Sequence, residues 1–305
     1  MNTALTNHLK IAILLLTPGV AVGLLGYGVA GWPGAGALAT IYGIFAIAAV
    51  FSAQRMVLRQ HAARYISERE APGLYGLMRE LAQRAGIEVP AVYLIPESAA
   101  QLLVTGASVT RSAVFISRGL LHALTREELG AVMAHAVSRI RTGAVVPMTI
   151  AAGMVEAIIS FSNYFRWSHL LPSTFVESEK RAGIPSDAFL WPLFAPVAAA
   201  LIRVSTFASR QVLEDEASAY LLGDARPLAE ALWNIEAYVA VAPLESASPA
   251  TAHLFICNPL SGDGWVKLFH THPPIGDRLK QLEALGRRSV GAGTWYGARQ
   301  ASQCK

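Results

Sequence analysis

Charged residues and cysteine are both scarce in this chain of 305 residues. Asp, Glu, Lys and Arg make up 15% of it, whereas soluble domains average about a quarter. Hydrophobic residues make up 53% and the mean hydropathy is +0.39. The two cysteines, Cys257 and Cys304, form no CxxC pair, so neither a disulfide framework nor a thiolate zinc site is expected. This composition excludes an ordinary soluble enzyme and predicts that part of the chain lies in lipid.

The chain also lacks the pattern of a nucleic-acid-binding protein. Its net charge is +4 and its sequence pI is about 9.2, but no basic stripe is interleaved with aromatic residues. Instead Arg55, Arg59 and Arg64 directly follow an apolar segment, which is where cytoplasmic cations gather beside membrane spans. We therefore expect a lipid bilayer, and no nucleic acid, as a partner.

Two uncharged apolar runs, residues 11–31 and 35–53, open the chain on either side of a turn at residues 32–34. Each run has about 20 residues, the length that crosses a hydrocarbon core of ~30 Å. Lys10 precedes the first run and the arginine group follows the second, so both ends should be cytoplasmic. Residues 1–63 are therefore predicted to form a transmembrane hairpin.

Residues 64–305 are expected to form one further domain of the α+β class, mainly α, with a small β-sheet. The local patterns predict an amphipathic helix, two short strands separated by a turn-rich stretch, and a helix that opens with a capping box. In that order the elements are Ala71–Gly86, Ala91–Ile95, the stretch around Thr105-Gly106, Ala113–Ser117, and the helix from Thr125 with Glu128.

A second apolar helical hairpin is expected to interrupt this domain at about 144–205. Its two runs, 144–162 and 188–202, contain prolines, and the second is short for a full crossing, so both remain open between spanning and partly embedded helices. The charged residues 163–187 between them predict an external loop. Glu156 in the first run is either functional or faces the protein interior and pairs with Arg203 or another basic group.

The helix that begins near Thr125 lacks a complete zinc-protease motif. Zinc proteases of the HExxH type place two histidines at i and i+4 on one helix face, and the intervening Glu accepts a proton from zinc-bound water. Residues 135–139 read His-Ala-Val-Ser-Arg instead. The apolar positions of this helix should face the core, which leaves Glu128, Ala131, His135 and Arg139 facing a cleft or solvent.

Several motifs in order make the chain similar to the HtpX family of membrane zinc metalloproteases. They are the hairpin, residues 70–75 (Glu-Ala-Pro-Gly-Leu-Tyr), residues 127–135 (Glu-Glu-Leu-Gly-Ala-Val-Met-Ala-His) and residues 271–275 (Thr-His-Pro-Pro-Ile). The resemblance covers nearly the whole chain. It implies a membrane-anchored, zincin-like metalloprotease fold in the bacterial inner membrane, with the protease-like domain facing the cytoplasm and with zinc as the family's cofactor.

Carried over residue by residue, the resemblance implies that most of the chemistry is missing. His135 takes the first ligand position, Ala136 the general base, Arg139 the second histidine, Gln211 the third ligand and Asp215 its supporting acid. The family's substrate-strand motif, Asn-Ala-Phe-Ala-Thr-Gly, is matched at residues 101–106 only by its last two residues. We therefore expect no intact catalytic residue and no bound metal, with His135 as a vestige.

Arg139 opposes a metal more strongly than a neutral residue would. A guanidinium about 4 Å from a dication is repelled by ~8 kcal/mol at an effective dielectric near 20. We expect Arg139 either to occupy the vacated site and pair with Asp215 or Glu214, or to extend into solvent. His272, before two prolines, can lend a nitrogen to a metal, but a turn or helix-start role is the simpler prediction.

The sequence thus predicts an inactive HtpX-like pseudoprotease that binds membrane-protein clients or a partner protease. The first alternative is a working membrane zinc endopeptidase with unusual ligands, His135 with Glu214 or His272. The second is a membrane assembly component whose cleft has no role. No feature of the sequence names the client, the partner or the oligomeric state.

Overall fold

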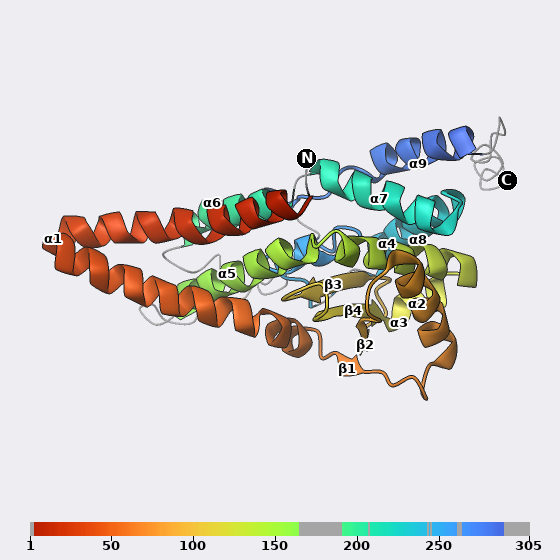
Figure 1. Cartoon of the computed structure of the whole chain (residues 1–305), viewed down its shortest axis with the longest axis horizontal. Helices are drawn as coiled ribbons and strands as arrows, with labels where there is room; N and C mark the ends of the chain where they lie inside the picture. Colours follow the sequence, from red (N-terminus) through yellow and green to blue (C-terminus); the bar gives the residue numbers. More distant parts are fainter. Residues whose placement is uncertain are drawn as a thin grey trace.

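The computed structural model describes residues 3–164, 191–206, 208–242, 244, 246–260 and 264–289. The molecule is elongated (Figure 1), with long helices projecting to one side of a domain that contains a small sheet. The helical majority and the single small sheet confirm the predicted fold class. The predicted division of the chain at residue 63 stays a prediction.

The long helix α1, Thr3–Gln60, is broken at Ala30 and Gly31, and Gly31 has a left-handed φ of +63°. Its stretch Leu5–Val50 is long and apolar enough to cross a membrane. At 1.5 Å per residue these 46 residues would extend ~70 Å, more than twice a hydrocarbon core. The helix folds back on itself at the break (Figure 1), so the predicted hairpin is present, with its bend just before residues 32–34.

The two arms of α1 pack closely because glycines face each other near the bend. A Cβ added at Gly26 would lie 2.4 Å from the carbonyl oxygen of Gly34. Farther along, the Tyr42 hydroxyl donates to the carbonyl of Leu15 at 2.7 Å. Large apolar side chains on the outer faces stay uncovered, as at Val29, which is 85% exposed. An apolar surface of this extent suits lipid rather than water.

Helices α5, Val145–Tyr164, and α6, Trp191–Ser205, lie along α1 in Figure 1 and confirm that both later apolar runs are helical. Helix α5 approaches α1 through Gly153, where an added Cβ would lie 2.4 Å from the Ala49 carbonyl oxygen. The apolar part of α6 is only 195–205, so full crossings by α5 and α6 stay predictions.

Two expectations about this region have different outcomes. Arg203 is exposed, and within the described part of the chain no ion pair joins it to Glu156, so that predicted pairing is wrong. The predicted external loop at 163–187 lies almost entirely outside the described residues.

The start of α1 is tied to the ends of other helices. The side-chain amide of Asn7 donates to the Thr142 carbonyl at 2.8 Å, just beyond α4, Arg126–Arg141. The Lys10 ammonium donates to the Ser205 carbonyl, at the end of α6, at 3.3 Å. The projecting helices are thereby anchored to the sheet domain.

The sheet has the order β1-β2-β4-β3, in which β2 and β4 run parallel and the two outer pairs are antiparallel. Its strands are β1 Arg64–Tyr65, β2 Ala91–Ile95, β3 Leu102–Gly106 and β4 Ser112–Ser117. The prediction of a turn at Thr105-Gly106 is wrong, because these residues end β3 and the turn follows at 107–111. Strand β3 is buried on both faces, so its residues show no alternation from which a strand could be predicted.

The remaining helical elements are α2 Pro72–Ala85, α3 Arg118–Ala123, α7 Ala208–Leu222, α8 Arg226–Val241, α9 Ile275–Ser289 and the 3₁₀ turns Ala252–Leu254 and Gly264–Phe269. Of these, α3 and the first 3₁₀ turn contact the sheet, and most of the others pack on α4 or on one another. The capping box of Thr125 and Glu128 starts α4 as predicted, and Gly86 ends α2 in a left-handed conformation. The principal hydrophobic core lies between the sheet and helices α2, α4, α8 and α9.

Candidate functional site

Helix α4 carries His135 and Arg139 one turn apart on the same face. Both side chains are 0% exposed, so the prediction that this face turns to a cleft or solvent is wrong. Helix α7 and residues 254–256 lie over it, which leaves every residue from Gly130 to Ile140 buried. The polar face of α4 therefore meets polar groups of other elements instead of water.

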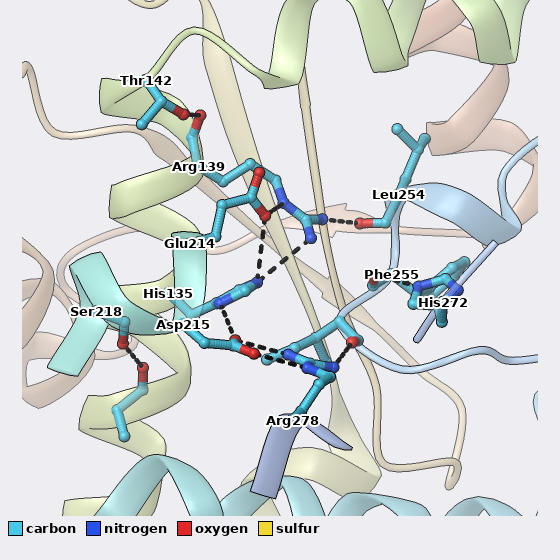
Figure 2. A network of polar contacts seen from close by, with 12 residues as sticks. His135, Arg139, Thr142, Glu214, Asp215, Ser218, Leu254, Phe255, His272 and Arg278 are labelled. Atoms are coloured by element: carbon cyan, nitrogen blue, oxygen red, sulfur yellow. Dashed lines mark hydrogen bonds and ion pairs between the residues drawn. The ribbon is translucent and has the colours of Figure 1, made fainter. Parts of the chain in front are cut away.

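Arg139 is held at three points inside the protein (Figure 2). Its Nε donates to Glu214 Oε2 on α7 at 2.8 Å, and its Nη1 donates to the Leu254 carbonyl at 2.8 Å. Its Nη2 lies 3.3 Å from Nε2 of His135. The predicted pairing of Arg139 with Glu214 is confirmed, and the alternative of an extended, solvated side chain is wrong.

Asp215, the other carboxylate considered for Arg139, binds a different guanidinium. Arg278 on α9 donates to it twice, from Nε at 2.7 Å and from Nη2 at 2.8 Å. The third group, Nη1, donates to the Ile256 carbonyl at 2.7 Å. Asp215 Oδ1, which accepts from Arg278 Nη2, also lies 3.0 Å from His135 Nδ1 (Figure 2). The two carboxylates of α7 thus serve two separate arginines.

The sequence reasoning missed Arg278. It lies 63 residues from its partner, so no local pattern joins the two. The sequence holds one signal that points to Arg278. The resemblance gives Asp215 a supporting role but no partner. Arg278 lies in the first turn of an amphipathic helix, five residues after Pro273, and can supply the missing positive charge.

These five side chains form a buried network without net charge, two guanidinium groups balancing two carboxylates around a histidine. Burial raises the pKa of Asp215, but the Arg278 guanidinium and then His135 outweigh it and hold that pKa well below its usual range. Burial lowers the pKa of His135 despite the nearby Asp215 carboxylate. His135 is therefore neutral at pH 7, and its contact with Arg139 requires Nε2 to accept and Nδ1 to carry the proton.

The other expected site positions contribute less. Ala136 is 0% exposed and its methyl group packs in the principal core. Gln211 is buried on α7, and its amide oxygen has no hydrogen-bond partner within the described residues, so the structure does not bring it into the network. His272 Nε2 lies 3.0 Å from the Phe255 carbonyl and therefore donates to it. The turn before α9 accommodates Pro273 and Pro274, as predicted.

Comparison with known sequences places this geometry in a family. Residues 68–286 match the sequence profile of Peptidase family M48, most of the chain. The chain belongs to peptidase family M48. This M48 chain is 34% identical over 279 residues to a "Protease HtpX homolog" of Pelotomaculum thermopropionicum, covering 92% of this chain and 99% of the relative. A relative of the same description from Thermococcus kodakarensis is 37% identical over 231 residues, 76% of this chain and 79% of its own length.

These matches confirm the predicted resemblance to the HtpX-like membrane metalloproteases of M48. Among solved structures, that described as "Crystal Structure of S. mikatae Ste24p" aligns with a TM-score of 0.43 and 16% identity. The alignment covers 92% of this M48 chain and 66% of the other protein, so the chain spans just under two thirds of that length.

The donor set around His135 in this M48 chain differs from the sets that hold zinc. Tetrahedral zinc needs three or four His, Cys, Asp or Glu ligands. Over the described ranges, no group of three or more such residues is placed to hold a metal ion. The two carboxylates nearest His135 are each bound by an arginine, and His135 Nε2 faces a guanidinium.

Proposed function

We propose that this M48 chain is a pseudoprotease, a member of the HtpX-like branch that has lost its zinc site and acts by binding. The observation that carries the proposal is the buried guanidinium of Arg139 beside His135, where the resemblance implies a second zinc-binding histidine. Its partners would be membrane-protein clients or an active protease.

The energetics of the network support this proposal. Zinc bound at His135 would require Arg139 to move away, which would leave Glu214 buried without a counter-charge and the Leu254 carbonyl without its donor. Breaking a buried ion pair costs about 3–5 kcal/mol. Were Arg139 to stay in place instead, its guanidinium about 4 Å from a dication would repel it by ~8 kcal/mol at an effective dielectric near 20. One neutral imidazole does not offset either cost.

The position of the general base supports the same proposal independently. Ala136 offers no proton acceptor, and its methyl group lies in the apolar core. Loss of general-base assistance alone lowers a rate by about 10²–10⁴. Hydrolysis would therefore need both a different metal site and a different base.

The proposed location is the bacterial inner membrane, with the sheet domain on the cytoplasmic side. The lipid-facing arms of α1 support membrane insertion. Arg55 and Arg59, both exposed near the end of α1, support a cytoplasmic end under the positive-inside bias. The client-binding role follows from membership of a membrane-protease family together with the proposed loss of catalysis.

The alternative of a working zinc endopeptidase needs His135 to share a metal with Glu214 or His272. Glu214 Oε2 lies 3.8 Å from His135 Nε2 but is bound by Arg139, and His272 Nε2 is used by the Phe255 carbonyl. The geometry favours this alternative less than the inactive role.

Metal analysis and a cleavage assay on the full chain separate the two. Protein purified in detergent with zinc present is analysed for metal, and a portion is incubated with an unfolded membrane protein with and without a chelator. We expect substoichiometric zinc, equal in wild type and His135→Ala, and no chelator-sensitive cleavage. One zinc per chain that disappears in the His135→Ala protein, with that variant still monodisperse, would establish the working enzyme instead.

A further inference from the structure

Strand β3 lies at the edge of the sheet. It pairs with β4 along one side, and its other side faces away from the sheet. The free side of an edge strand presents unpaired N–H and C=O groups and accepts extended peptides as additional strands. Here part of this side is already covered by residues 254–256, which we call the internal segment. Leu103 pairs with Phe255 in an antiparallel bridge, and Ile256 N donates to the Leu102 carbonyl at 2.9 Å.

Every carbonyl of the internal segment is bound by a side chain from around the network (Figure 2). Arg139 Nη1 donates to Leu254 O at 2.8 Å, and Arg278 Nη1 donates to Ile256 O at 2.7 Å. Between them, His272 Nε2 lies 3.0 Å from Phe255 O. Three donors from two helices and a turn thus bind three successive carbonyls, as a receptor binds an extended peptide.

The side chains of the segment are enclosed as well. Leu254, Phe255 and Ile256 are each 0% exposed. The Phe255 ring packs edge-on against His61, with centroids 5.5 Å apart. His61 and Gln60 in turn bind Ser246, so the end of α1 fixes the chain leading into the segment. Backbone and side chains are therefore held together in one register.

We infer that the internal segment is a built-in occupant of the peptide-binding edge of β3. It closes the Leu102–Leu103 end of this edge to extended chains from other proteins, and such a chain binds at that end only when residues 254–256 are displaced. The donors that would hold a peptide carbonyl in this place are already used by the chain itself. The inference rests on these contacts alone and holds whether or not the protein cleaves peptides.

A disulfide trap tests whether the segment lies on β3 in this register. Leu103→Cys and Phe255→Cys are introduced into the full chain with Cys257 and Cys304 changed to Ser. Ile256 N bonds Leu102 O, so the bridge is a non-hydrogen-bonded antiparallel pair, whose Cα atoms lie ~4.5 Å apart and suit a disulfide. The matched control is Val104→Cys with Phe255→Cys, because adjacent residues of a strand point to opposite faces.

Peptide binding tests whether the segment blocks the edge. The probe is a fluorescein-labelled peptide with the sequence of residues 250–259, with Ser in place of Cys257. Ile256→Pro removes the N–H that bonds Leu102, and Ile256→Val keeps it, so the two variants form a matched pair. We expect the Pro variant to bind the probe at least about fivefold more tightly than the Val variant, the factor that one backbone hydrogen bond provides.

The two tests are joined by adding the Leu103→Cys/Phe255→Cys pair to the Ile256→Pro protein. We expect probe binding in reductant and its loss on oxidation. Equal crosslinking of the control pair, equal binding by the Pro and Val variants, or binding unchanged by oxidation would each overturn the inference. Zinc content and cleavage are not involved, so these outcomes are distinct from those that would overturn the pseudoprotease proposal.

Discussion

Arg139 and Glu214 are buried partners, and each is costly to leave without the other. We expect Arg139→Met to lower the free energy of unfolding by about 3–5 kcal/mol, because Glu214 stays buried and unpaired. Glu214→Leu should cost a similar amount, because Arg139 then stays buried without its counter-charge. The double variant should recover most of the loss, since well-packed apolar residues often replace a buried pair at little cost.

A double-mutant cycle of thermal or denaturant unfolding in detergent measures this coupling. The exposed pair of Arg79 and Glu68, 2.7 Å apart, provides a control cycle with an expected coupling below about 1 kcal/mol. If the two losses at Arg139 and Glu214 simply add, the two side chains do not stabilise each other, and the predicted coupling is wrong.

His253 should make the protein sensitive to mild acid. Burial lowers its pKa from 6.5 to about 4 despite the Met148 carbonyl that it binds. A histidine with a lowered folded pKa stabilises the fold above its unfolded pKa, and that stability is lost as pH falls from about 6.5 toward 4. Between pH 6.5 and 5 the loss is about 2 kcal/mol for this group.

Apparent Tm in detergent at pH 7 and pH 5 checks this expectation. His253→Gln, which has no titrating group, should lose less stability between the two pH values than wild type. His122→Gln, at an exposed site on α3, is the matched control and should behave as wild type. An unchanged pH dependence in His253→Gln would show that another group causes the acid sensitivity.

At this scale, part of the network is predictable from the sequence, but Arg278 is missed and Gln211 lies outside the network. The i, i+4 spacing and the mapping onto the family are enough to place His135, Arg139 and Asp215 together. Burial of that face is not predictable, because a charged helix position ordinarily indicates solvent. The compensating charges come from α7 and α9, and pairings over such distances in sequence leave no local pattern.

Helices and strands with local signals are predicted close to their observed bounds. The capping box of α4, the glycine that ends α2 and the β-branched and aromatic residues of β2 each identify an element within a few residues. Strand β3 escapes prediction because its burial depends on residues 254–256, which follow it by some 150 positions. Strand β1 has only two residues, too few for a pattern.

The close approach of the two arms of α1 depends on the absence of side chains at Gly26 and Gly34. An added Cβ at either position would lie less than 2.5 Å from the other's carbonyl oxygen. We expect Gly26→Val to force the arms apart and to destabilise the protein by about 1–3 kcal/mol, the usual cost of overpacking. Gly28→Ala, where an added Cβ meets nothing within 4 Å, is the control.

Two measurements report this change: the apparent Tm of the protein in detergent, and the labelling rate of a cysteine placed on α1. Both should shift in Gly26→Val and stay at the wild-type level in Gly28→Ala. Equal stability of the two variants would show that the arms do not pack as closely as described.

At the scale of the whole molecule, the bend of α1 and the sheet domain should lie on opposite sides of the membrane. A membrane-impermeant maleimide should label Val29→Cys, 85% exposed near the bend, from the periplasmic side of intact cells. Tyr65→Cys, 55% exposed in β1, should be labelled only in inverted vesicles. The background again has Cys257 and Cys304 changed to Ser. Labelling of both sites from one side would contradict the proposed topology.

The anchoring of α1 has a consequence for biosynthesis. Lys10 is translated early, but the Ser205 carbonyl to which it donates lies 195 residues later in the chain. At ~5–20 residues per second, a ribosome needs about 10–40 s to reach that acceptor. During this interval the first arm has to be retained by contacts with lipid and with its own second arm and, once residue 142 has been made, by the bond from Asn7 to the Thr142 carbonyl. The first arm thus reaches its attachment to the end of α6 only after the intervening residues have been made.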